Sequence, residues 1–194
     1  MTPYLTWLRQ DGKNELPILQ LSAIPRWKPE NFGSVERKEL HHSLGASTKD
    51  FGQCSYLRFQ NDSGRIHCCF VAGKSRVTPL KPVTIPCLKW QAAVIFLKVS
   101  HQIHQELSLN DVPEFFWFDR NVVLGYITNE SRRFHVFVAN WVQLIEDANS
   151  VDQWKYVELK WSPANEASHG LSPSALLTLK WLKGPNFLLQ VKDK

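Results

Sequence analysis

The chain has 194 residues, of which 43% are hydrophobic and 21% are charged. This balance is typical of one globular domain and excludes a disordered chain, which has too few apolar residues to form a core. The net charge of +5 permits a polyanionic partner but does not require one, because many basic proteins bind no nucleic acid.

Residues 1–36 are predicted to form an arm outside the main sheet. Apolar side chains from Trp7 to Trp27 would pack on a surface, but three prolines interrupt the second half of the stretch. Proline removes a backbone donor and restricts the residue before it. We therefore expect an extended, irregular segment here.

The next three segments, 38–44, 52–60 and 65–73, are expected to be strands of an antiparallel meander. The turn between the second and third is NDSG, a strong hairpin signal. Residues 74–86 contain three prolines and are expected to be a connection.

The hydrophobic period then changes. From Leu88 to Leu107, apolar residues recur at helical spacing and predict a helix of about 20 residues. Residues 114–118, EFFWF, are too apolar for a surface strand and suit a buried central one. The remaining expected elements are a short helix at 121–128, a helix around 134–145, a strand at 154–159 and a helix after Pro163.

The predicted element order is therefore β-β-β-α-β-α-α-β-α. Because a long helical crossover precedes the fourth strand, that strand can lie parallel to the first. Sites in such sheets form at the carboxyl ends of the strands, where the topology changes direction. This arrangement would bring Gly45 and Asp119 side by side.

This order is that of the ribonuclease H fold, and the chain resembles the ribonuclease H segment of Bel/Pao-type LTR retrotransposon polyproteins. The resemblance covers residues 16–188 and rests on the strings LHHSLGAS, GKSRVTPLKPVTIPCL, FFWFDRNVVLGYI, ESRRFHVFVANWVQLI and WKYVELKWSPANEASHGL. It implies an α/β fold whose five-stranded mixed sheet has three antiparallel strands, then two parallel ones, with helices on both faces. The implied domains are an arm at 1–36, a ribonuclease H-like domain at 37–171 and a tail or connector at 172–194.

In that family, four acidic side chains bind two magnesium ions and cut the RNA strand of an RNA–DNA hybrid. By resemblance, the four positions fall on Gly45, Lys89, Asp119 and Asn165, so only Asp119 keeps its carboxylate. The three replacements change the charge by about four units, and a divalent pair needs anionic oxygens to offset its desolvation. We therefore expect no metal and no cofactor here, although the intact family uses magnesium.

Lys89 is expected to reach Asp119 and form a partly buried ion pair where the family binds metal. The alternative is that Lys89 lies in solvent and Asp119 is hydrated. His101 and His104, three residues apart, are expected on a solvated helix face, and His41 and His42 are expected to be structural.

Several basic residues are candidate phosphate contacts for an RNA–DNA hybrid or another nucleic acid. Scattered basic residues also simply keep a surface soluble, so both interpretations stay open. The candidates are Lys74, Arg76, Lys81, Arg132 and Arg133. Other partners implied by the resemblance are adjoining reverse transcriptase and integrase segments of a polyprotein.

The cysteines indicate an intracellular protein. Cys68 and Cys69 are adjacent on an expected strand and would point to opposite faces, and no CxxC pair is present to suggest zinc. We expect reduced, buried thiols in a cytoplasmic or nuclear protein. The sequence has neither a signal-peptide pattern nor an apolar run of about 20 residues, so no membrane partner is expected.

Three functions remain open from the sequence. The first is a catalytically inactive ribonuclease H-like domain with residual affinity for RNA–DNA hybrid. The second is an active or weakly active metal-dependent ribonuclease H that uses Asp119 with other ligands. The third is a protein-interaction scaffold retained by a host, because a fold does not determine its function.

Overall fold

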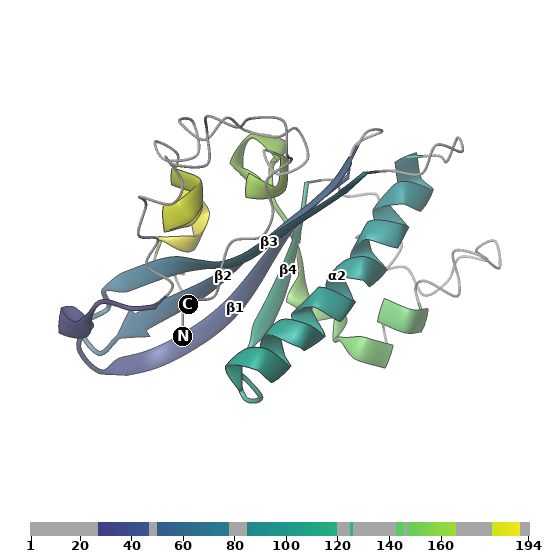
Figure 1. The fold of residues 1–194 in the computed structure, drawn as a ribbon. Coiled ribbons are helices and arrows are strands. Elements are labelled where there is room, and N and C mark those ends of the chain that lie inside the picture. The colour runs from purple at the N-terminus through teal and green to yellow at the C-terminus, as the bar shows by residue number, and fades with distance from the viewer. Residues whose placement is uncertain are drawn as a thin grey trace, which may run out of the picture.

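A five-stranded sheet forms the centre of the computed structural model, which describes residues 27–46, 50–77, 85–119, 125, 143–145, 147–165 and 180–190 (Figure 1). The strand order is β3-β2-β1-β4-β5. The strands are β1 (Val35–Ala46), β2 (Asp50–Asn61), β3 (Ile66–Val77), β4 (Glu114–Phe118) and β5 (Trp154–Tyr156). The predicted arm at 1–36 lies mostly outside the described residues.

The strand directions confirm the predicted mixed sheet. β1, β2 and β3 form an antiparallel meander, while β1 with β4 and β4 with β5 are parallel. The predicted hairpin is also present: Asn61 N–H donates to Arg65 O, and Gly64 has φ +77°, a value that favours glycine. The fold is therefore the ribonuclease H-like α/β fold expected from the sequence.

Three strand boundaries differ from the prediction by three residues or more. β1 begins at Val35 rather than at 38. Residues 74–77 belong to β3 rather than to the connection, because Lys74 pairs with Gln53 and Val77 with Asp50 before the first proline of the connection is reached. β5 ends at Tyr156 rather than at 159. Two backbone hydrogen bonds then turn the chain: Trp161 N–H donates to Glu158 O, and Ser162 N–H to Leu159 O.

Helix α2 (Ile85–Leu107) covers one face of the sheet (Figure 1). It begins three residues before the predicted start, since Pro86 fits the first turn of a helix, where its missing N–H is not needed. The core beneath it contains Phe32, Leu40, Leu57, Phe59, Cys69, Val71, Val99, Ile103 and Leu109. The predicted helices at 121–128 and 134–145 lie mostly outside the described residues.

The C-terminal segment 180–190 covers part of the opposite face. It contains two short 3-10 helices, η4 (Lys180–Lys183) and η5 (Asn186–Leu188), and Leu188 is buried with Tyr56 and Phe70. Gly184 lies so close to the sheet that a Cβ there would be 2.7 Å from Cys68 Cβ, and its φ is +89°. Residues 180–190 of the predicted tail thus complete a second core on the sheet.

The cysteines follow the predicted pattern. Cys68 belongs to the core under residues 180–190, whereas Cys69 belongs to the core under α2. Burial raises the pKa of both thiols to about 12, so both stay protonated at neutral pH. Cys54, Cys68 and Cys69 are all buried, and none of the three forms a disulfide.

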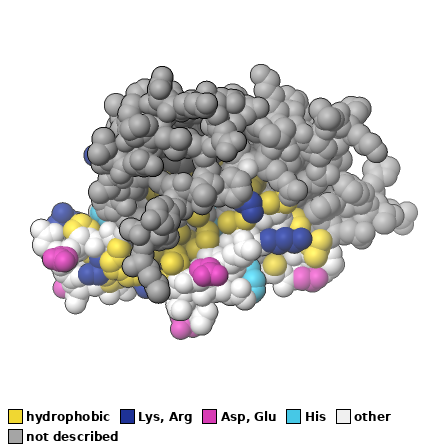
Figure 2. Space-filling model, in the orientation of Figure 1, with side chains coloured by type: hydrophobic (Ala, Val, Ile, Leu, Met, Phe, Trp, Pro, Cys, Tyr) yellow, Lys and Arg dark blue, Asp and Glu magenta, His cyan; other side chains and the backbone are white. Residues whose placement is uncertain are grey.

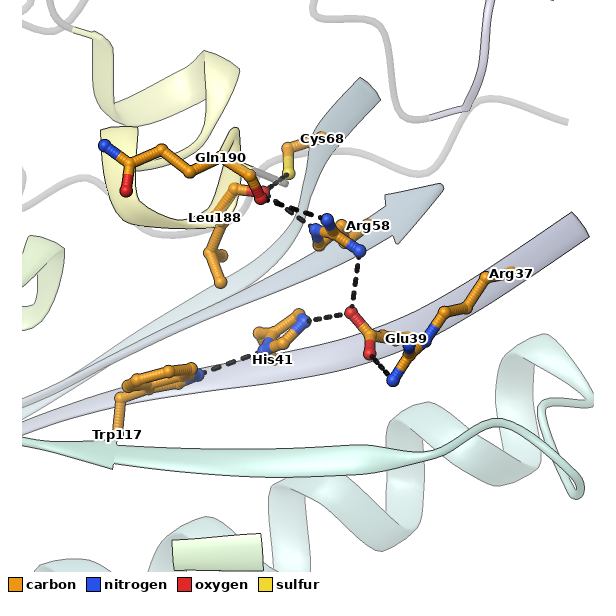
Figure 3. Close-up of polar contacts among 8 residues, drawn as sticks. All are labelled: Arg37, Glu39, His41, Arg58, Cys68, Trp117, Leu188 and Gln190. Atoms are coloured by element: carbon orange, nitrogen blue, oxygen red, sulfur yellow. Dashed lines mark hydrogen bonds and ion pairs between the residues drawn. The ribbon is translucent and has the colours of Figure 1, made fainter. Parts of the chain in front are cut away.

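A buried ion pair joins β1, β2 and the C-terminal segment (Figure 3). Arg58 Nη1 donates to Glu39 Oε2 at 2.9 Å, and Glu39 and Arg58 are 0% and 2% exposed. Arg58 also donates to two backbone carbonyls, from Nε to Leu188 O at 2.8 Å and from Nη2 to Gln190 O at 3.2 Å. Each of the three guanidinium nitrogens thus donates a hydrogen bond, and these bonds offset part of the cost of burying the charge.

The Glu39 carboxylate also ends a chain of hydrogen bonds that begins on β4 (Figure 3). Trp117 Nε1–H donates to His41 Nδ1 at 3.0 Å, and His41 Nε2 lies 3.2 Å from Glu39 Oε2. Since Trp117 can only donate, His41 Nδ1 must accept, and the proton of the neutral ring is on Nε2. This tautomer lets His41 donate to Glu39, and the expectation that His41 is structural fits its burial.

We expect Arg58→Met to destabilise the domain by about 3–5 kcal/mol, because it leaves the Glu39 carboxylate buried without its main partner. Arg37→Met is the matched control. Arg37 contacts the same carboxylate at 2.7 Å, but its side chain is 52% exposed, so the expected loss is under about 1 kcal/mol. Urea unfolding followed by circular dichroism measures both, and equal losses would contradict the importance of the buried pair.

Candidate functional site

The carboxyl ends of β1 and β4 meet as predicted. Leu44 pairs with Phe118 in the parallel register, so the next residues, Gly45 and Asp119, lie at the same edge of the sheet. Gly45 is buried and Asp119 is partly buried. Two of the four positions taken from the resemblance are therefore neighbours.

A third segment, residues 162–165, packs against these strand ends. Ser162 Oγ lies 3.1 Å from Ser43 Oγ of β1, and Cys54 Sγ of β2 lies 3.6 Å from Pro163 O. A helix begins at Pro163, as predicted, and Asn165 N–H donates to Ser162 O at 3.2 Å. Asn165 therefore directly follows Ala164, the residue of this segment that packs against Gly45.

The absence of a side chain at Gly45 allows a very close approach. A Cβ built on Gly45 would lie 3.1 Å from Ala164 O, 3.2 Å from Ala164 C and 3.3 Å from Ala164 Cβ. Ala164 is fully buried. An aspartate at position 45 would thus have to displace the backbone of the final helix.

Lys89 lies in the first part of α2, and its side chain is outside the described residues. The predicted Lys89–Asp119 ion pair therefore stays a prediction. The described residues contain no group of three or more His, Cys, Asp or Glu side chains placed to hold a metal ion. The positions taken from the resemblance are a poor match to the anionic oxygens that paired magnesium ions need. Gly45 offers no side-chain oxygen, Asn165 offers a neutral one, and a Cβ at position 45 would lie 3.1 Å from Ala164 O.

The predicted phosphate contacts are only partly covered by the structure. Lys74 is half-buried on β3, and the backbone of Arg76 pairs with Phe51. Lys81, Arg132 and Arg133 lie outside the described residues. On the face in Figure 2, Lys and Arg side chains alternate with Asp and Glu side chains over the described part, rather than forming one basic surface.

A second polar cluster lies between β1, β4 and α2, on the same two strands at whose ends Gly45 and Asp119 lie. His42 Nε2 lies 2.9 Å from Glu114 Oε1, and His104 Nε2 lies 3.4 Å from Glu114 Oε2. Ser100 of α2 also donates to Glu114. His42 fits the expectation of a structural residue, but His104 was placed wrongly: it turns toward β4 and is not on the solvated helix face.

The environment of Glu114 lowers its pKa although burial alone would raise it. The causes that lower the pKa are the hydrogen bond and charge of His42, the hydrogen bond from the Ser100 hydroxyl and the charge of His104. The cluster therefore holds a carboxylate between strand and helix. The described residues show no substrate pocket at this cluster, and we regard the cluster as structural.

A shallow hollow of about 600 Å³ lies at the carboxyl end of β5. Its lining residues are Tyr156, Glu158, Leu159, Lys160 and Asn165. Of these, only Asn165 was a predicted site residue. One sequence signal could have identified the hollow: the run of aromatic and basic residues at 154–161, WKYVELKW. The same run is also typical of a strand, so it does not predict a hollow by itself.

None of the described helices is long and apolar enough to cross a membrane.

The sequence matches a family model described as "Pao retrotransposon-like RNaseH-like domain" over residues 10–120, more than half of the chain. No curated protein matches.

Two solved structures illustrate the similarity in fold. Ribonuclease H1 from the archaeon Halobacterium salinarum is 12% identical, with a TM-score of 0.42 over 74% of this chain and 99% of that one. LC11-RNase H1, solved in complex with RNA/DNA hybrid, is 12% identical, with a TM-score of 0.41 over 72% of this chain and 99% of that one.

The lowered pKa of Glu114 predicts a pH dependence of stability. A carboxyl group whose folded pKa lies below its unfolded value stabilises the fold above that unfolded value, about 4.3, and loses the contribution as pH falls through the folded pKa. We expect the stability difference between wild type and Glu114→Gln to shrink as pH falls below about 4.3. Urea unfolding at a series of pH values measures it. Glu106→Gln, at an exposed position near the end of α2, is the control. A stability difference between wild type and Glu114→Gln that stays constant through this pH range would contradict the prediction.

The contact between Gly45 and Ala164 predicts a steric effect of any side chain at position 45. We expect Gly45→Ala and Gly45→Asp each to lower the free energy of unfolding by about 1–3 kcal/mol, the usual cost of overpacking. Gly125→Ala is the control, because Gly125 is exposed and no atom of the described residues lies within 4 Å of a Cβ there. A neutral Gly45→Ala variant would show that Ala164 moves aside freely.

Proposed function

Because this chain belongs to the Pao retrotransposon-like RNaseH-like domain family, we propose that it is a retroelement-derived ribonuclease H-like domain that no longer cleaves RNA in RNA–DNA hybrids. The observation that carries the proposal is the packing of Gly45 against Ala164 O, at 3.1 Å from an added Cβ. A side chain at position 45 would require Ala164 to shift by a few tenths of an ångström, so the strand end is packed for a residue without a side chain.

Hydrolysis of a phosphodiester by two metal ions needs several carboxylate oxygens that hold the ions about 4 Å apart. Asp119 can supply one carboxylate at the end of β4. The amide oxygen of Asn165 is a weaker ligand than a carboxylate, and Gly45 supplies no side-chain oxygen. One carboxylate among these positions is too little negative charge to offset the desolvation of two divalent ions.

Lys89 adds a further electrostatic obstacle. The resemblance aligns it with a metal-binding glutamate, so an ammonium group takes the place of a carboxylate in the ligand set that the family uses. A cation of the protein close to a divalent cation is strongly unfavourable at short range. An ion pair with Asp119 would neutralise the remaining carboxylate as well, and we propose this pair as part of the inactive state.

The second part of the proposal is residual affinity for RNA–DNA hybrid. The net charge of +5 and the five basic candidates of the sequence support it. The adjoining reverse transcriptase and integrase segments of a polyprotein are the further partners that family membership suggests. Binding and cleavage are separate properties, because phosphate contacts do not need the metal site.

We expect no cleavage of a labelled RNA–DNA hybrid by the full chain with Mg²⁺ or Mn²⁺, above a buffer control. Asp119→Asn is the matched variant, since it removes the last carboxylate without changing the size of the side chain. Wild-type cleavage that disappears in Asp119→Asn would overturn the proposal and favour a weak metal-dependent ribonuclease. Calorimetric titration of Mg²⁺ into the wild type should likewise give no heat of specific binding.

Restoring the three missing carboxylates tests whether their loss is what prevents metal binding. The variant Gly45→Asp/Lys89→Glu/Asn165→Asp has all four carboxylates, and we expect it to bind Mg²⁺ in the same titration. Without metal it should be less stable than Lys89→Glu/Asn165→Asp, since only the triple variant displaces Ala164. A triple variant that binds no Mg²⁺ would mean that the missing carboxylates are not what prevents metal binding.

A further inference from the structure

Three large side chains lie exposed within six residues at the end of β5. The exposed fractions are 46% for Tyr156, 46% for Leu159 and 47% for Trp161. Tyr156 and Leu159 line the hollow beside Asn165. Large aromatic side chains are usually much more buried than this, so two exposed ones within six residues at the end of a strand need an explanation.

The backbone around these side chains is well ordered by hydrogen bonds. Val157 N–H donates to Phe118 O at 2.7 Å, which fixes the end of β5 against β4. The 3-10 helix η3 (Leu159–Trp161) follows, and Ser162 is buried against β1 immediately after it. Tyr156 and Trp161 are therefore presented to solvent by a rigid support, which limits the entropy lost when a ligand binds.

We propose that Tyr156 and Trp161 form a stacking site for unpaired nucleotides of a single-stranded nucleic acid. The inference rests on the nucleic-acid affinity proposed above and names the part of the surface and the strand state involved. Aromatic faces beside basic side chains are the composition of sites that bind single strands without sequence preference. The exposed Lys155 and Lys160 supply the basic side chains here.

The charges around the site favour stacking over phosphate contact. Lys160 Nζ lies 5.4 Å from the centroid of the Trp161 ring, but it also lies 2.6 Å from Glu158 Oε2. Glu158 thus offsets much of the positive charge of Lys160. The affinity of this site should therefore depend mainly on the ring faces and only weakly on salt, unlike binding through phosphates.

A nucleic acid fits this surface better than a protein partner does. Lysine is depleted at protein–protein interfaces, and two lysines lie within this short segment. The site also lies beside Asn165, at the end of the sheet where the strand ends Gly45 and Asp119 meet. An unpaired end that leaves a duplex near those strand ends would reach Tyr156 without crossing the domain.

The test is fluorescence anisotropy of labelled oligonucleotides with the full chain. The ligands are a blunt RNA–DNA hybrid, the same hybrid with a single-stranded extension, and the single strand alone. We expect Tyr156→Ala/Trp161→Ala to weaken binding of the single strand and of the extended hybrid by roughly 5- to 100-fold, at low and at high salt, and to leave blunt-hybrid binding unchanged.

Four further variants separate stacking from other effects. Trp27→Ala is the matched control, because Trp27 is 50% exposed and Lys38 Nζ lies 5.4 Å from its ring centroid, the same arrangement as Lys160 on Trp161. Trp161→Phe should keep most of the affinity, and Leu159→Ala should have no effect, since leucine has no ring face. Glu158→Gln should strengthen binding by releasing Lys160.

The outcomes distinguish this inference from the proposed function. If the wild type binds blunt hybrid but the double variant binds the single strand as well as the wild type does, the stacking site is rejected while hybrid affinity stands. If single-strand binding depends on Tyr156 and Trp161 but blunt hybrid is not bound, the stacking site stands and hybrid affinity is rejected. Two results would instead identify an apolar protein interface and overturn the inference. One is a loss of nucleic-acid affinity in Leu159→Ala as large as that in the double variant. The other is self-association of the wild-type chain that rises with concentration and is abolished in Tyr156→Ala/Trp161→Ala.

Discussion

Two opposite charges lie inside this domain, Glu39 on β1 and Arg58 on β2, at positions that pair directly across the two strands. Neither could remain buried alone, because an unpaired charge in a protein interior is very costly. The guanidinium needs the carbonyls of Leu188 and Gln190 as well, and these come from the far end of the chain. The first two strands and the C-terminal segment therefore depend on one another for stability.

This arrangement separates the stability of the domain from the chemistry at the strand ends. The ion pair, the core under α2 and the core under residues 180–190 use none of the four positions that resemble a metal site. Gly45 instead packs closely against Ala164, so that a Cβ at position 45 would lie 3.1 Å from Ala164 O. A fold of this kind can lose its metal ligands and remain intact, which is why the fold alone gives no answer about catalysis.

The sequence predicted the elements whose hydrophobic period is regular. The meander, α2 and the apolar strand EFFWF were predicted from period and turn residues, and the register then brought Gly45 and Asp119 together. It missed features that depend on distant contacts. Arg58 looks like an outward-facing residue of an alternating strand, and its burial follows only from Glu39 and residues 188–190. His104 looked solvated because its partner, Glu114, lies on another element.

The way in which Arg58 holds the C-terminal segment has a consequence for sequence drift. Its guanidinium donates hydrogen bonds to the backbone carbonyl oxygens of Leu188 and Gln190, and every amino acid has such an oxygen. Gln190 is exposed, so its identity matters little to the attachment, whereas the buried Leu188 is constrained mainly by size and apolarity. A retroelement lineage can therefore accept substitutions at position 190 while residues 180–190 stay attached to the sheet, provided that Glu39, Arg58 and Gly184 are kept.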